Sequence, residues 1–190
     1  TKLNGLTIIN QQNKILYQIP QELIITASLV RKSTHRPHKS LAKLAGKNDD
    51  ALIALYLIYE RDRGESSFFA PYFKVLPENV PNLSTFSAEE LDELQDPTFM
   101  QRVQRDQEKN AAFFGRIASQ LKEFYGNVFQ GRIGGGPSTP TLTDYIWAKA
   151  IVDSRGLRFR GRVHLAPLAC MMNYDPHPDS RKAQSGEFFL

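Results

Sequence analysis

The chain has 190 residues, a net charge of +4 and a composition that is 41% hydrophobic and 23% charged, which is typical of a globular protein. This length suffices for one domain with a hydrophobic core and a helical insertion. No apolar run approaches the ~20 residues of a membrane-spanning helix, and the single cysteine, Cys170, excludes an internal disulfide. The four histidines show no metal-binding spacing, so we predict no metal site.

The first part of the chain has the pattern of short strands. Residues 6–9 and 15–19 are β-prone runs separated by a polar turn, which predicts a hairpin. Pro20 should end the second strand because it has no backbone N–H for the ladder. Residues 23–26 form a third short apolar segment.

Positive charge is concentrated in two segments. The first runs from Arg31 to Lys47 and the second from Arg155 to Arg162, reading RGLRFRGR. We interpret the first as a solvated basic connector. The alternative is a contact surface for an acidic partner, and RNA contact through both segments is one form of that hypothesis.

Helix signals follow the basic connector. Asp49 or Asp50 can cap a helix that starts near Ala51, has one apolar face and ends at Gly64. Later patterns predict a short helix opened by the capping box at Ser87, and two longer helices over residues 99–125 and 142–153. A Gly- and Pro-rich linker, residues 131–140, precedes the last of them.

Three motifs occur in the order of one known family. They are LYLIYERDRGESSFFAPYFKVLP (55–77), SAEELDELQDP (87–97) and TLTDYIWAKAIVDSRGL (141–157). Together they resemble the SET-domain proteins related to Rubisco large-subunit lysine methyltransferase and the actin-histidine methyltransferase. The resemblance covers nearly the whole chain and implies an α+β fold. Residues 1–30 would be the N-terminal SET β-part, 49–130 the helical insertion, and 141–190 the SET core segment.

The resemblance also implies S-adenosylmethionine as the cofactor, bound at three places. The first is a Gly-x-Gly turn, matched here by Leu3, Asn4, Gly5 and Leu6. Glycine suits such a turn because a Cβ would block close approach of the donor. Leu3 replaces the first glycine, and an ordinary strand start is the alternative interpretation.

The second place is the Ser-Arg pair that ends the last predicted helix. The planar guanidinium of Arg155 can bind the donor's carboxylate bidentately, although a cation there also suits the helix C-terminus. The third place is an Asp-x-x-Asn-His segment. This chain keeps its asparagine as Asn173 but has Cys170 for the acid and Tyr174 for the histidine.

The family's catalytic tyrosine and its C-terminal pseudoknot strand have no match before Leu190, so we assign no catalytic residue. These departures predict weak or absent donor binding. They also predict a chain without catalytic activity as given, acting as a structural or interaction subunit of a larger complex. The alternative is the N-terminal part of an active S-adenosylmethionine-dependent protein-lysine or protein-histidine N-methyltransferase. The sequence does not determine the compartment, because composition does not separate plastid, mitochondrial and cytosolic members of such families. A plastid or mitochondrion is our expectation, with the cytoplasm as the alternative.

Overall fold

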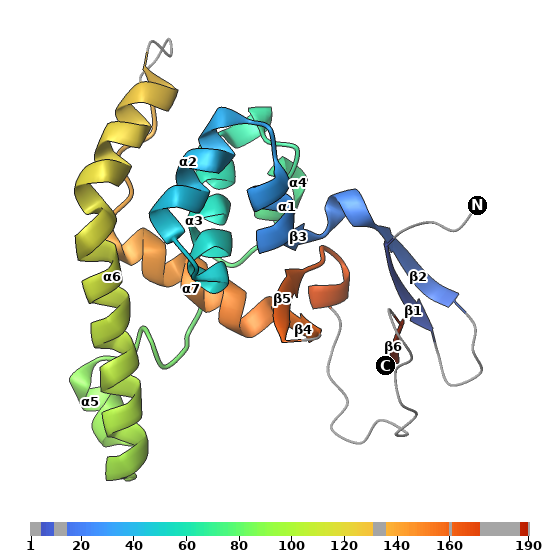
Figure 1. The fold of residues 1–190 in the computed structure, drawn as a ribbon. Helices are drawn as coiled ribbons and strands as arrows, with labels where there is room; N and C mark the ends of the chain where they lie inside the picture. The colour runs from blue at the N-terminus through green and yellow to red at the C-terminus, as the bar shows by residue number, and fades with distance from the viewer. Residues whose placement is uncertain (1–4, 10–14, 131–135, 160, 172–186, 190) are drawn as a thin grey trace.

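The computed structural model describes residues 5–9, 15–130, 136–159, 161–171 and 187–189, and it combines helices with two small sheets (Figure 1). This is the α+β class that the sequence predicts. The elements are, in order, β1 (Gly5–Ile9), β2 (Ile15–Pro20), η1 (Gln21–Leu23), β3 (Ile25–Thr26), α1 (Ala27–Lys32), α2 (Arg36–Ala45), α3 (Asp49–Asp62), η2 (Gly64–Ser66), α4 (Ala70–Phe73), α5 (Ala88–Asp92), α6 (Pro97–Phe129), α7 (Leu142–Arg155), β4 (Leu157–Phe159), β5 (Arg162–Leu165), η3 (Ala169–Met171) and β6 (Glu187–Phe189).

Each sheet joins distant parts of the chain. In the first, of order β2-β1-β6, β1 pairs antiparallel with β2 and parallel with β6. The predicted hairpin is therefore confirmed, and Pro20 is the last residue of β2. The second sheet, of order β3-β5-β4, pairs Ile25 with Leu165 and Leu157 with His164. It therefore fixes the start of the helical region against the segment that follows α7.

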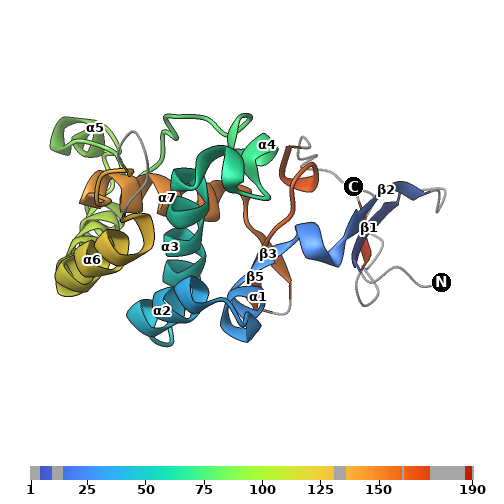
Figure 2. The ribbon, with the colours of Figure 1, turned by 90° about the horizontal axis from the view of Figure 1, so that it is seen from above.

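Helix α3 lies at the centre of the helical region, between α2 and α7 (Figure 2). Each of its residues from Ala51 to Glu60 is buried. The sequence pattern indicated one apolar face, but a helix enclosed by neighbours on all sides is apolar around its circumference. The N-cap of α3 is also not the predicted Asp49 or Asp50. Asn48 is the N-cap, and its side chain accepts a hydrogen bond from the N–H of Ala51 at 3.0 Å.

The basic segment from Arg31 to Lys47 is not a solvated loop, and that prediction was wrong. Helix α1 begins after Thr26, whose side chain caps it, and α2 follows after three intervening residues. Leu41 and Ala45 of α2 are buried. Their four-residue spacing places both on one helix face. The cations of α2 lie on its exposed face. Their number in the sequence made the short apolar stripe difficult to recognise.

The remaining helices confirm the predicted capping signals and extend some boundaries. Ser87 and Glu90 form the capping box of α5. Helix α6 starts at Pro97, because Asp96 accepts hydrogen bonds from the first N–H groups, and it runs to Phe129. Thr141 and Asp144 form a second capping box, at the start of α7.

Candidate donor-binding site

At the end of α7 the backbone of Gly156 lies very close to Val152 and Val163. Gly156 follows Arg155, and its N–H donates to the carbonyl of Val152 at 3.0 Å. A Cβ at Gly156 would lie 2.3 Å from that carbonyl oxygen and 2.8 Å from Cγ1 of Val163 in β5. Only glycine fits there without a shift of its neighbours. The chain thus turns directly from α7 into β4, and this turn holds Arg155 just after the buried residues Ala150, Ile151 and Val152.

Arg155 reaches the segment that carries the third predicted donor motif. Its half-buried guanidinium donates from Nη1 to the carbonyl oxygen of Cys170 at 3.4 Å. The two residues are 15 positions apart in the chain. The fold therefore brings the Ser-Arg pair beside the residue that replaces the family's acid. The hydroxyl of Ser154 donates to the carbonyl of Ala150 at 2.7 Å, within its own helix.

The thiol of Cys170 meets a buried tyrosine. Its Sγ lies 3.3 Å from the hydroxyl oxygen of Tyr72 in α4, and Tyr72 is 6% exposed. Burial, followed by the contact with Cys170, raises the pKa of Tyr72, so the phenol stays neutral. Tyr72 belongs to the 55–77 motif, but no role at the site was predicted for it. Its position in a proline-bounded aromatic motif was the available signal.

The first predicted donor place connects to the same region through the hairpin. Leu6 of β1 pairs with Ile19 of β2. Ile19 is 2% exposed and forms a small hydrophobic cluster with Ile24, Ala166 and Ala169. Since Ala169 adjoins Cys170, the hairpin that contains Gly5 and Leu6 comes close to Cys170 through Ile19.

Asn4, Asn173 and Tyr174 lie outside the residues that the structure describes, and so does Leu3. Their assignment to the donor site stays a prediction. Of the six residues predicted to contact the donor, the structure therefore places Gly5, Leu6 and Arg155.

The second basic segment is partly neutralised. Arg158 contacts Asp50 of α3, with Nη2 3.2 Å from Oδ2. Lys149 of α7 lies 3.9 Å from the same carboxylate and 3.4 Å from that of Asp153. The contacts of Arg158 and Lys149 with Asp50 tie β4 and α7 to the start of α3, and the Arg158 pair reduces the charge that the segment could offer to RNA.

Within the described ranges, no group of three or more His, Cys, Asp and Glu side chains is arranged to hold a metal ion. None of the helices in that part of the chain is long and apolar enough to cross a membrane.

The arrangement of the β-hairpin, the second sheet and the helices between them is that of a SET-domain protein. Its fold matches the branch of this family that contains Rubisco large-subunit methyltransferase. It is similar to SET domain-containing protein 4 of Artemia parthenogenetica, with 30% identity over 151 residues that make up 78% of this chain and 34% of the relative. No protein-family model matches the chain.

Solved structures show the same fold. The SET domain of LSMT bound to lysine and AdoHcy matches with a TM-score of 0.69 and 25% identity over 90% of this chain. Rubisco LSMT bound to AdoMet matches with a TM-score of 0.68 and 23% identity over 92% of it. The chain spans about a third of the length of these relatives, 34% of the crustacean protein and 37% of each solved chain.

Proposed function

We propose that this chain forms the donor-binding part of an S-adenosylmethionine-dependent protein N-methyltransferase that acts on lysine or histidine. The observation that carries the proposal is the 3.4 Å contact between Arg155 and Cys170, which lie in two of the three segments predicted to bind the donor. The packing of Ile19 against Ala166 and Ala169 supports it, because it brings the first motif to the same region.

The residues present fit the donor's chemistry. S-adenosylmethionine, when bound, supplies a methyl group on a sulfonium centre and carries an amino-acid carboxylate. Arg155 would hold that carboxylate, since a planar forked cation binds carboxylates bidentately. The backbone near Gly5 would allow close approach, because glycine has no Cβ. Neutral Tyr72 would keep the Cys170 segment in place through its contact with Sγ.

Isothermal titration with S-adenosylmethionine tests the proposal. We expect binding in the micromolar range by the wild-type chain. Arg155→Ala should weaken it by about tenfold or more, because a hydrogen bond to a charged group contributes about 1.5–3 kcal/mol. The matched control is Arg162→Ala, which removes the same charge from an exposed position in β5. No binding by the wild type, or equal losses in both variants, would contradict the proposal.

A second candidate is a structural or interaction subunit without catalysis. The observation that favours it is that the family's acid is replaced by Cys170, whose thiol contacts the Tyr72 hydroxyl. A thiol is a weak acceptor and cannot stand in for a carboxylate. If neither the wild type nor Cys170→Asp binds S-adenosylmethionine in the same titration, while both keep the wild-type circular dichroism spectrum, this second function is supported over the first.

A further inference from the structure

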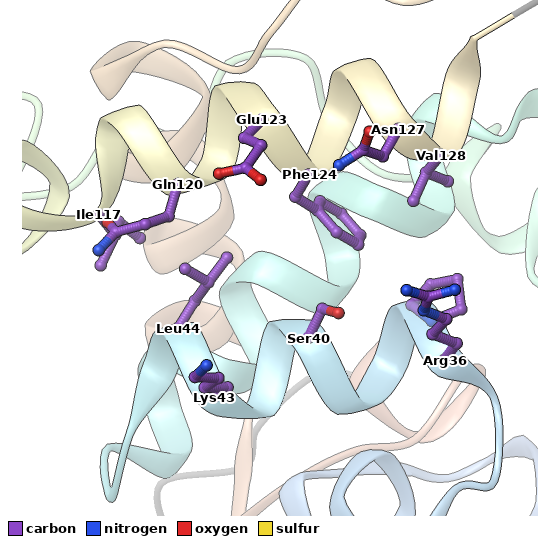
Figure 3. Close-up of a pocket in the computed structure, with 11 residues that line it drawn as sticks. Arg36, Ser40, Lys43, Leu44, Ile117, Gln120, Glu123, Phe124, Asn127 and Val128 are labelled. Carbon is purple, nitrogen blue, oxygen red and sulfur yellow. The ribbon is translucent and has the colours of Figure 1, made fainter.

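Away from the donor site, α2 and α6 enclose a groove of about 760 Å³ (Figure 3). Leu44 projects into it from α2, and Phe124 and Val128 project from α6. Phe124 is 8% exposed, and its ring lies 5.9 Å from the ring of Tyr59 in α3, measured between centroids. The apolar floor of the groove is therefore anchored in the hydrophobic core, and it does not depend on surface side chains for its shape.

The α2 side of the groove is positively charged. Its ten residues include Arg36, Lys39 and Lys43 but no acidic residue. Arg36 and Lys43 line the groove, and both are exposed. Among the residues that the structure describes, neither of these two cations takes part in an ion pair. Arg31 differs, since its guanidinium lies 2.9 Å from the carboxylate of Asp49.

We propose that this groove binds an acidic amphipathic helix of a partner protein. Leucine-like side chains on one face of that helix would cover Leu44 and Val128, over the largely buried ring of Phe124, and carboxylates along its edge would pair with Arg36 and Lys43. Helix-in-groove recognition uses this combination, in which apolar anchors recur every three or four residues. Charge complementarity then sets the orientation and speeds association.

The walls of the groove favour a peptide over RNA. Glu123 lines the α6 side and confines a partner's anionic groups to the α2 edge of the groove, which suits a helix with carboxylates along one edge but not a phosphate backbone that is charged along its whole length. The aromatic ring in the groove, that of Phe124, is too buried to stack on a base, which is how single strands are usually held. Gln120 and Asn127 also line α6 and offer amide groups that suit a peptide's polar edge.

A display library of random 16-residue peptides, unbiased in charge, is the probe. Selection on the 190-residue chain should enrich sequences rich in Asp and Glu with apolar residues at i, i+3 or i+4, and i+7. The affinity of a selected peptide should fall when NaCl is raised from 50 to 500 mM, because salt screens exposed charges. Enrichment of basic or uncharged peptides, or no enrichment, would overturn the proposal.

Two double variants locate the binding. Arg36→Glu with Lys43→Glu should weaken the selected peptide by at least about tenfold, since each lost charge pair contributes on the order of 1 kcal/mol. The control, Arg102→Glu with Arg105→Glu, makes the same charge change at exposed positions of α6 that do not line the groove. It should leave the affinity for the peptide within about twofold of the wild type. Equal effects would refute the assignment. Tighter binding of a single-stranded RNA 20-mer than of the peptide would also refute it. A third refuting result would be that the chain forms a dimer and that Arg36→Glu with Lys43→Glu dissociates this dimer.

Discussion

The Nη1 atom of Arg155 lies 3.4 Å from the carbonyl oxygen of Cys170, and the Sγ of Cys170 lies 3.3 Å from the hydroxyl of Tyr72. Cys170 thus connects the two helices: its backbone carbonyl contacts Arg155 at the end of α7, and its side chain contacts Tyr72 in α4. This connection is the centre of the candidate donor site. It also makes the site sensitive to changes at Gly156 and Cys170.

Gly156→Ala should destabilise the protein and disturb the position of Arg155. The added Cβ would lie 2.3 Å from the backbone oxygen of Val152, so the chain must shift. We expect a loss of about 1–3 kcal/mol in the free energy of unfolding, measured by urea denaturation. Gly126→Ala is the control. A Cβ at Gly126 in α6 meets nothing within 4 Å, and alanine there should stabilise the helix by about 0.5–1 kcal/mol. Similar results for the two variants would refute this account of the turn.

Cys170→Asp should strengthen S-adenosylmethionine binding severalfold if the chain binds this donor. A carboxylate would restore the strong acceptor that the resemblance to the family implies at this position. Asparagine has nearly the same shape as aspartate but no charge, so the Cys170→Asn variant should bind the donor like the wild type. Titration calorimetry measures both. If the two substitutions change affinity equally, the missing charge at this position is not what weakens the site.

Glu60 should make stability fall at acid pH. Burial acts to raise the pKa of this carboxyl, but hydrogen bonds from His38 and Ser67 and the Arg63 cation outweigh it and hold the pKa below its ordinary value of 4.5. The folded state therefore binds this proton less readily than the unfolded state. The contribution to stability is complete above about pH 4.5 and is lost as pH falls through the lowered pKa.

Glu60→Gln tests this assignment. Glu60 is 1% exposed, and its Oε1 lies 3.0 Å from Nη1 of Arg63. Removing one partner of a buried charged group should cost about 3–5 kcal/mol at pH 7. The loss should shrink as the pH is lowered towards 3. Glu108→Gln, on the exposed face of α6, should change stability by less than about 0.5 kcal/mol. A loss in Glu60→Gln that is the same at both pH values would show that the charge of Glu60 is not involved.

Tyr125→Phe should loosen the contact between α6 and α3. The Tyr125 hydroxyl donates to Oδ2 of Asp62 at 2.9 Å, and Tyr125 is 3% exposed. Without this donor, a carboxylate that is largely buried loses a partner, at a cost of about 1–3 kcal/mol. Thermal unfolding should therefore shift to lower temperature, by about 2–4 °C for each kcal/mol in a chain of this size. An unchanged midpoint would mean that the hydrogen bond contributes nothing net.

The sequence allowed prediction of the features that depend on local signals. The hairpin, the capping boxes of α5 and α7 and the helix stop at Gly64 each follow from a few neighbouring residues. The helical nature of residues 31–47 was missed because the charge of the segment outweighed its weak Leu41 and Ala45 stripe. The enclosure of α3 on all sides arises from packing that no local window contains.

The candidate site was only partly predictable for the same reason. The resemblance identified Arg155 and Cys170 as separate motifs, but their contact depends on the pairing of β3, β4 and β5. Tyr72 could not be assigned, since it joins Cys170 from 98 residues away in the chain.

Hydrogen-exchange mass spectrometry with S-adenosylmethionine tests the central claim most directly. The wild-type chain is compared with and without 1 mM donor. We predict slower exchange at residues 154–159 and 166–171, which contain Arg155 and Cys170, and unchanged exchange at residues 97–110 at the start of α6. Exchange that stays the same at both predicted segments, or slows only elsewhere, would contradict the assignment of this site to the methyl donor.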